Sequence, residues 1–229
     1  EQIHAKTSVT ELKRENFPDE EVLPSFAPAV GAGAGGQEWE VPRFLRTTKC
    51  VALSPMERGT AMHALMQHLD FAEVPDIAAI ERQARSLFDQ GILTEEAYQS
   101  LDVRNVWRFV SSALGRRLRE AKRVYRELPF GRLLPAKKYY KEAQDEADRI
   151  FLQGIIDVLF EEENGDYILL DYKTDRHISP QDARTRYQFQ IDLYCDAVET
   201  ILGRPVKECY LFLLETGREV RMERQAASA

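Results

Sequence analysis

The chain has 229 residues, of which 44% are hydrophobic and 30% charged, as in ordinary globular proteins, and its net charge of −7 argues against a surface built for non-specific nucleic-acid binding. Three cysteines without CxxC spacing argue against a disulfide framework, a zinc knuckle and a four-cysteine iron–sulfur cluster. No apolar run approaches the roughly 18 residues that cross a bilayer and no signal peptide opens the chain, so we expect a cytoplasmic protein without membrane contact.

Residues 1–40 are expected to form an N-terminal segment and a flexible linker. A short helix is predicted over residues 3–14, with Ser8 as its N-cap and Glu11 as the matching acid of a capping box. The stretch that follows is rich in Pro, Gly and Ala and ends in VGAGAGGQEWE, which is typical of a linker. No GxxxxGK(S/T) motif occurs, so no ATP site is expected in this chain, and the start without methionine indicates a piece of something longer.

Residues 41–225 are expected to form one domain, followed by a tail at 226–229. Its helical part, 54–122, begins with SPMERGTAMHALMQHLDF, in which Ala61, Leu65 and Leu69 share one stripe. Further helices are predicted over 75–90, 94–101 and 103–122.

A basic stretch, Arg116–Arg126, closes the helical part. It reads RRLREAKRVYR and includes Arg116 and Arg123. One interpretation is a solvated helix face; the other is a rim that follows the phosphates of DNA beside an active site. The sequence leaves both open.

The sheet core is expected over residues 123–225. The β-type runs are VYRELPF, KKYYKE, RIFLQGIIDVLF and DYILLDYKT, followed by a helix that Ser179-Pro180 opens and Gly203 ends, and by strands at 206–214 and 218–222. Strands, a helix and a further strand indicate an α/β fold with a mixed sheet flanked by helices.

Two of these runs form a predicted hairpin that carries one aspartate on each strand. If Glu163-Asn164-Gly165 is a three-residue turn with Gly165 in the left-handed position, Glu162 faces Asp166, and Asp157 then faces Asp171. A two-residue turn would instead place the two aspartates on opposite faces of the hairpin. Lys173 shares the face of Asp171 because strand side chains alternate.

This hairpin predicts a metal site. Carboxylates among apolar residues are costly unless a partner compensates them, and paired acids that hold a hard divalent cation beside a lysine suit phosphodiester hydrolysis. A structural Asp–Lys pair is the alternative. His63, alone in its helix, is by itself more typical of a structural histidine.

Tyr187, Gln190 and Tyr194 fall on one face of the predicted helix after the hairpin. Aromatic residues at this spacing are usually core, whereas a carboxamide among them requires a hydrogen-bond partner, such as the backbone or a DNA phosphate.

Five ordered motifs, RGTAMHALMQHLDF, RELPF, GIIDVLF, DYKTD and YxxQxxxY, together resemble the RecB-like branch of the PD-(D/E)xK nuclease superfamily, most closely the C-terminal nuclease domains of AddA-type helicase–nucleases. The resemblance covers residues 54–222. It implies a restriction-endonuclease-like fold and Mg²⁺-dependent hydrolysis of DNA, with Mn²⁺ as an alternative ion.

The resemblance also assigns residues. It implies that Asp157 and Asp171 bind metal with His63 and the carbonyl of Tyr172, and that Lys173 is catalytic. Gln190 and Tyr194 match a motif that supports the site and engages DNA. Glu127 matches a recurrent acid to which no chemical role is assigned.

The same resemblance implies partners: single-stranded DNA, helicase motor domains of a parent chain and an AddB-like protein, in double-strand-break repair by recombination. Like the AddA branch, the chain lacks the four cysteines of an iron–sulfur cluster. Two alternatives stay open, namely an inactive nuclease fold that serves as a scaffold, and a stand-alone exonuclease of the same superfamily.

Overall fold

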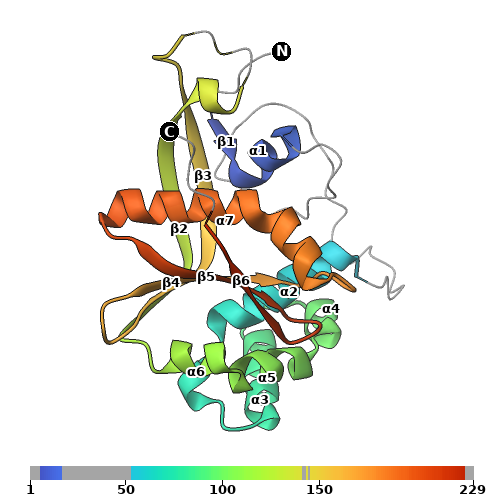
Figure 1. Cartoon of the computed structure of the whole chain (residues 1–229). Helices are drawn as coiled ribbons and strands as arrows, with labels where there is room; N and C mark the ends of the chain where they lie inside the picture. Colours follow the sequence, from blue (N-terminus) through green and yellow to red (C-terminus); the bar gives the residue numbers. More distant parts are fainter. Residues whose placement is uncertain (1–5, 17–52, 141–142, 144, 225–229) are drawn as a thin grey trace, which may run out of the picture.

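The computed structural model describes residues 6–16, 53–140, 143 and 145–224. The glycine-rich stretch and most of the predicted linker therefore lie outside the described residues. The predicted α/β class is confirmed: a mixed sheet carries helices on both faces (Figure 1).

The six-stranded sheet is built around strand β3 (Arg149–Glu161), which pairs antiparallel with β2 (Arg123–Pro135) along its whole length. The other edge of β3 pairs in parallel with β1 (Lys6–Ser8) and antiparallel with β4 (Tyr167–Lys173). Beyond β4 follow β5 (Val206–Leu213), which is parallel to it, and β6 (Arg218–Met222), which is antiparallel to β5.

The predicted register of the β3–β4 hairpin is confirmed. Glu162 donates its N–H to the carbonyl of Asp166, Gly165 has a φ of 86°, and Val158 pairs with Leu170. A positive φ is the conformation that glycine adopts at no steric cost, so Gly165 fixes the three-residue turn. The turn thereby sets which side chains of the two strands share a face.

Helix α7 (Pro180–Leu202) connects the parallel strands β4 and β5. Ser179 caps its N-terminus and Gly203, with a φ of 65°, ends it, as predicted. Alternate residues of β4 belong to two separate apolar clusters: Leu169 packs with α7, and Leu170 packs with the upstream helices. Burial on both faces explains why this strand is a continuous apolar run.

The helical part covers the other face of the sheet. Its helices are α2 (Pro55–His68), α3 (Ile77–Asp89), α4 (Glu95–Ser100), α5 (Val103–Ser111) and α6 (Ala113–Arg119), with the short 3₁₀ turn η2 (Phe71–Glu73) after α2. Thr94 caps α4 as a side-chain acceptor. The helix predicted over 103–122 is wrong as one element, because Ser112 ends α5 and caps α6 through Gly115.

The predicted cap of the N-terminal helix is confirmed, whereas the predicted first residue of that helix is wrong. Ser8 and Glu11 form the capping box, but residues Lys6–Ser8 are strand β1, and helix α1 (Val9–Asn16) begins only at Val9. Leu12 is completely buried among residues of the α7-side cluster. This segment therefore packs on the sheet.

The predicted β-run KKYYKE is wrong over residues 137–140, and its last two residues lie outside the described part of the chain. Ala136–Lys138 form a 3₁₀ turn, η3, in which Tyr139 and Tyr140 donate their N–H groups to the carbonyl of Ala136. β2 ends at Pro135, directly before this turn. Among the helices that the structure describes, none is long and apolar enough to cross a membrane.

Candidate active site

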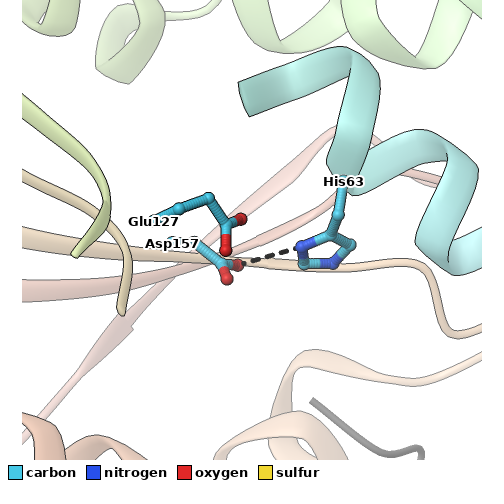
Figure 2. A group of neighbouring side chains, drawn as sticks. All are labelled: His63, Glu127 and Asp157. Carbon is cyan, nitrogen blue, oxygen red and sulfur yellow. Dashed lines mark ion pairs between the residues drawn. The ribbon is translucent and has the colours of Figure 1, made fainter. Parts of the chain in front are cut away.

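Helix α2 delivers His63 to the sheet. The start of α2 is fixed by a capping box between Ser54 and Glu57. Gly59 lets the helix approach the end of β4, since a Cβ there would lie 3.0 Å from Oγ1 of Thr174. One turn later, Nδ1 of His63 lies 3.5 Å from Oδ2 of Asp157 (Figure 2).

Asp157 lies where the β3–β4 ladder stops. The last paired residues are Val158 and Leu170, and Oδ2 of Asp157 accepts the N–H of Tyr172 at 2.8 Å. Burial works to raise the pKa of Asp157, but His63, Lys173 and the Tyr172 N–H outweigh it, so the pKa is lowered. Asp157 is therefore a buried carboxylate held in its charged form.

Glu127 faces Asp157 from strand β2. Its neighbours Arg126 and Leu128 pair with Val158 and Ile156, whereas Glu127 has a φ of 46° and is absent from the ladder. Such a φ is uncommon outside glycine and marks a residue that its surroundings hold in place. Burial, followed by the charge of Asp157, raises the pKa of Glu127 to about 7.

Three side chains from three elements thus form a possible ligand group. One ligand atom each of His63, Glu127 and Asp157 lies within 4.8 Å of the others, and Figure 2 shows the three converging. One imidazole nitrogen and carboxylate oxygens are ligands that Mg²⁺, Mn²⁺ and similar divalent cations accept.

Asp171 and Lys173 form the second half of the site. Nζ of Lys173 lies 2.6 Å from Oδ2 of Asp171. Burial raises the pKa of Asp171 to about 6, with Lys173 opposing and Asp157 adding to this shift. Burial alone would lower the pKa of Lys173, but Asp171 and Asp157 outweigh it, so the pKa is raised and the ammonium keeps its proton.

Helix α7 closes the site with Gln190. Its Oε1 accepts from Nζ of Lys173 at 3.3 Å, and its Nε2 donates to Oδ1 of Asp171 at 3.4 Å and to the hydroxyl of Tyr194 at 2.9 Å. The carboxamide thus finds its partners within the protein. Tyr187 donates its hydroxyl to Asp175 at 2.7 Å, and its ring lies 4.4 Å from Nζ of Lys173.

The predicted site residues share one cavity of 340 Å³. His63, Asp157, Asp171, Tyr172, Lys173, Tyr187 and Gln190 line it together with Glu127, while Tyr194 lies behind Gln190. The donor set fits a divalent cation: several carboxylates face one space where an added positive charge would relieve their repulsion. The carbonyl of Tyr172 as a further ligand stays a prediction.

The two basic residues proposed as a DNA rim lie elsewhere. Arg116 and Arg123 are exposed and do not line this cavity. Their neighbours bind the protein itself: Arg117 pairs with Glu162 and Glu208, and Arg126 donates to the carbonyl of Leu69. Arg117 and Arg126 therefore hold α6 and β2 to the rest of the fold, while DNA contact by Arg116 and Arg123 stays a prediction.

Sequence reasoning assigns no chemical role to Glu127, although the residues around it carry a usable signal. An acid flanked by Tyr125, Leu128 and Phe130 in a β-type run has the same pattern that singles out Asp157. What is missing from the sequence is the register of β2, since residues 136–148, which join β2 to β3, are longer than a hairpin turn.

The chain matches known proteins over nearly its whole length. Residues 38–229 match the family model described as the PD-(D/E)XK nuclease superfamily. An ATP-dependent helicase/nuclease subunit from Ruminiclostridium cellulolyticum is 38% identical over 230 residues, which covers 96% of this chain and 17% of that protein. Its counterpart from Heliobacterium modesticaldum is 43% identical over 79% of this chain and 13% of that protein.

A third relative, the helicase/nuclease subunit of the same name from Bacillus velezensis, is 35% identical over 94% of this chain and 18% of that protein. The chain thus spans less than a fifth of the length of the curated relatives that it matches.

Proposed function

Because the chain belongs to the PD-(D/E)XK nuclease superfamily, we propose that it hydrolyses DNA phosphodiester bonds at the cavity that contains Asp157 and Asp171. The observation that carries the proposal is the convergence of two buried aspartates, a protonated lysine and a histidine from separate elements on one cavity. A purely structural Asp–Lys pair would not require His63 and Glu127 to converge on the same space.

Each residue has a proposed role. Asp157, Asp171 and His63 hold a divalent cation, Mg²⁺ in the cell, and Glu127, which groups with His63 and Asp157, is a further candidate ligand. When bound, that cation supplies positive charge at the phosphoryl group and acidifies water. The residues that would hold it lie in a cavity that is also lined by Tyr172 and Tyr187.

Lys173 stabilises the negative charge that develops on the phosphate. Its ammonium is held in the cavity between Oδ2 of Asp171 and Oε1 of Gln190, so it needs no rearrangement during the reaction. Gln190 in turn is oriented by the hydroxyl of Tyr194. This chain of hydrogen bonds fixes the lysine relative to the metal ligands.

The relatives named as helicase/nuclease subunits support a more specific proposal. The substrate is single-stranded DNA delivered by helicase domains, cleaved exonucleolytically during recombinational repair of double-strand breaks in the cytoplasm. An AddB-like protein is the proposed partner. Neither an ATP site nor an iron–sulfur cluster is proposed for this chain.

The test is cleavage of end-labelled single-stranded DNA with and without Mg²⁺. We expect Mg²⁺-dependent cleavage that Asp171→Ala abolishes, with unchanged circular dichroism, whereas the exposed turn variant Glu163→Ala cleaves normally. Cleavage by Asp171→Ala at the parent rate would refute the proposed site. Mg²⁺ binding without cleavage by the parent chain would favour the inactive-scaffold alternative.

A further inference from the structure

Helix α1 contributes a lysine to the wall of the active-site cavity. Lys13 is only 3% exposed and lines the cavity that contains Asp157 and Asp171. The position of α1 is fixed on both sides: β1 pairs with β3 immediately before it, and Leu12 is fully buried against the sheet. Figure 1 shows α1 next to β1 and above α7.

Lys13 and the proposed catalytic lysine gather at one aromatic ring. Nζ of Lys13 lies 4.6 Å and Nζ of Lys173 lies 4.4 Å from the centroid of the Tyr187 ring. The hydroxyl of Tyr187 is bonded to Asp175, which fixes the ring between α7 and the end of β4. The face of an aromatic ring attracts cations, so Tyr187 holds two ammonium groups in one small region.

Lys13 and Lys173 supply the positive charge in the cavity wall. Among the lining residues that the structure describes, the lysines are Lys13 and Lys173, and none is an arginine. Lys173 lies 2.6 Å from Asp171, so its ammonium is held beside a proposed metal ligand. A DNA strand that enters this cavity carries a phosphate on every nucleotide, so phosphates beside the scissile one need their own positive partner.

We propose that Lys13 binds a phosphate of the DNA strand next to the scissile phosphate and thereby positions the strand for cleavage. This inference rests on the proposed nuclease function. It makes α1, which the sequence places with a linker, part of the substrate site. The competing interpretation is that Lys13 only balances the negative charge of the cavity acids.

The two interpretations differ in the salt dependence of DNA binding. Binding of a fluorescent single-stranded oligonucleotide is measured against salt concentration in an Asp171→Asn background that blocks cleavage. Each phosphate contact that is lost reduces the slope of log K against log salt by about 0.7 for single strands. We expect this reduction for Lys13→Met, which keeps the aliphatic stem, and the parent slope for Lys13→Arg.

Kinetics provide the second readout, in the chain with Asp171 intact. Lys13→Met is expected to raise KM for single-stranded DNA by about tenfold, the loss of one charge-assisted contact, with kcat changed less than about twofold. Lys207→Met is the matched control, since Lys207 is exposed at the start of β5 and does not line the cavity. It is expected to match the parent in both measurements.

Each outcome decides between the two roles of Lys13. An unchanged salt slope in Lys13→Met would overturn the inference, and tighter Mg²⁺ binding with an unchanged slope would assign Lys13 to charge balance instead. If Lys13→Met does not fold, Lys13→Gln is measured in the same way. A reduced slope of log K against log salt in Lys13→Arg would also count against a simple charge contact. Absence of DNA cleavage by the parent chain would refute the nuclease function itself.

Discussion

Nδ1 of His63 lies 3.5 Å from Oδ2 of Asp157, which joins a helix of the upstream part to the central strand of the sheet. Because the charge of Asp157 offsets the burial of the imidazole, the pKa of His63 is raised rather than lowered. The contact therefore links two of the proposed metal ligands, one from α2 and one from β3.

Replacing His63 is expected to weaken metal binding. His63→Ala removes one of the proposed ligands, so the Mn²⁺ dissociation constant measured by calorimetry should rise at least about tenfold. Glu81→Ala, on the exposed side of α3 and outside the cavity lining, is the control and should bind like the parent. Equal affinity in both variants would remove His63 from the ligand set.

Glu127→Gln is expected to separate metal binding from stability. The variant loses a proposed ligand, but it also loses a half-buried carboxylate that faces Asp157. Without metal its Tm should rise by about 2–4 °C, the effect of relieving roughly 1 kcal/mol in a protein of this size. Addition of Mg²⁺ should raise the Tm of the parent by more than it raises the Tm of the variant. Glu163→Gln, in the exposed turn, should change neither value.

The close approach of α2 to β4 is testable through Gly59. Gly59→Ala places a Cβ 3.0 Å from Oγ1 of Thr174, so either the Thr174 side chain or α2, which carries His63, has to shift. We expect reduced nuclease activity and weaker metal binding. Thr174→Ala removes the opposing oxygen, and the double variant should regain most of the lost activity. No recovery would mean that Gly59 matters for another reason.

Gly165 should be sensitive to replacement because of its φ of 86°. Gly165→Ala is expected to cost about 1 kcal/mol in the free energy of unfolding, measured with urea. Gly165→Asn should cost less, since asparagine tolerates the left-handed conformation. An equal loss of unfolding free energy in both variants would show that the positive φ of residue 165 is not the cause of the destabilisation.

Arg117→Gln tests the structural role assigned to the basic stretch. Arg117 pairs with Glu162 and Glu208, partly exposed, so the loss at pH 7 should be below about 1 kcal/mol. Burial acts to raise the pKa of Glu208, but hydrogen bonds and charge, chiefly from Arg117, outweigh it and lower that pKa, so the pair stabilises the fold above the ordinary glutamate pKa. The difference between variant and parent should therefore shrink as the pH falls through the lowered pKa, while DNA binding stays unchanged at pH 7.

The hairpin shows what a sequence can determine. Its register follows from local rules, because three turn residues and strict alternation leave few arrangements, and the structure confirms it. His63 is predicted only through the family resemblance, since nothing in a helix pattern says which distant strand it will meet. Glu127 requires the register of β2 against β3, which a connection as long as residues 136–148 does not set by local turn rules.

The remaining errors have local causes. Ser112 can cap a helix or continue one, and in the structure it caps α6. The break brings residue 115 so close to the Phe109 carbonyl oxygen that a Cβ would collide with it, and Gly115 makes this approach possible. The place of Lys13 is not predictable from its own segment, because α1 joins the site through the pairing of β1 with β3, a relationship between distant parts of the chain.

The hydrogen bond from the Tyr172 N–H to Oδ2 of Asp157 gives the site a built-in spectroscopic probe. In most strands an amide proton reports on a neighbouring backbone carbonyl, but this one reports directly on a carboxylate proposed to bind metal. Its NMR chemical shift should therefore respond to metal titration and to substitution of His63. A single backbone resonance would follow the charge state of the site without any label attached to it.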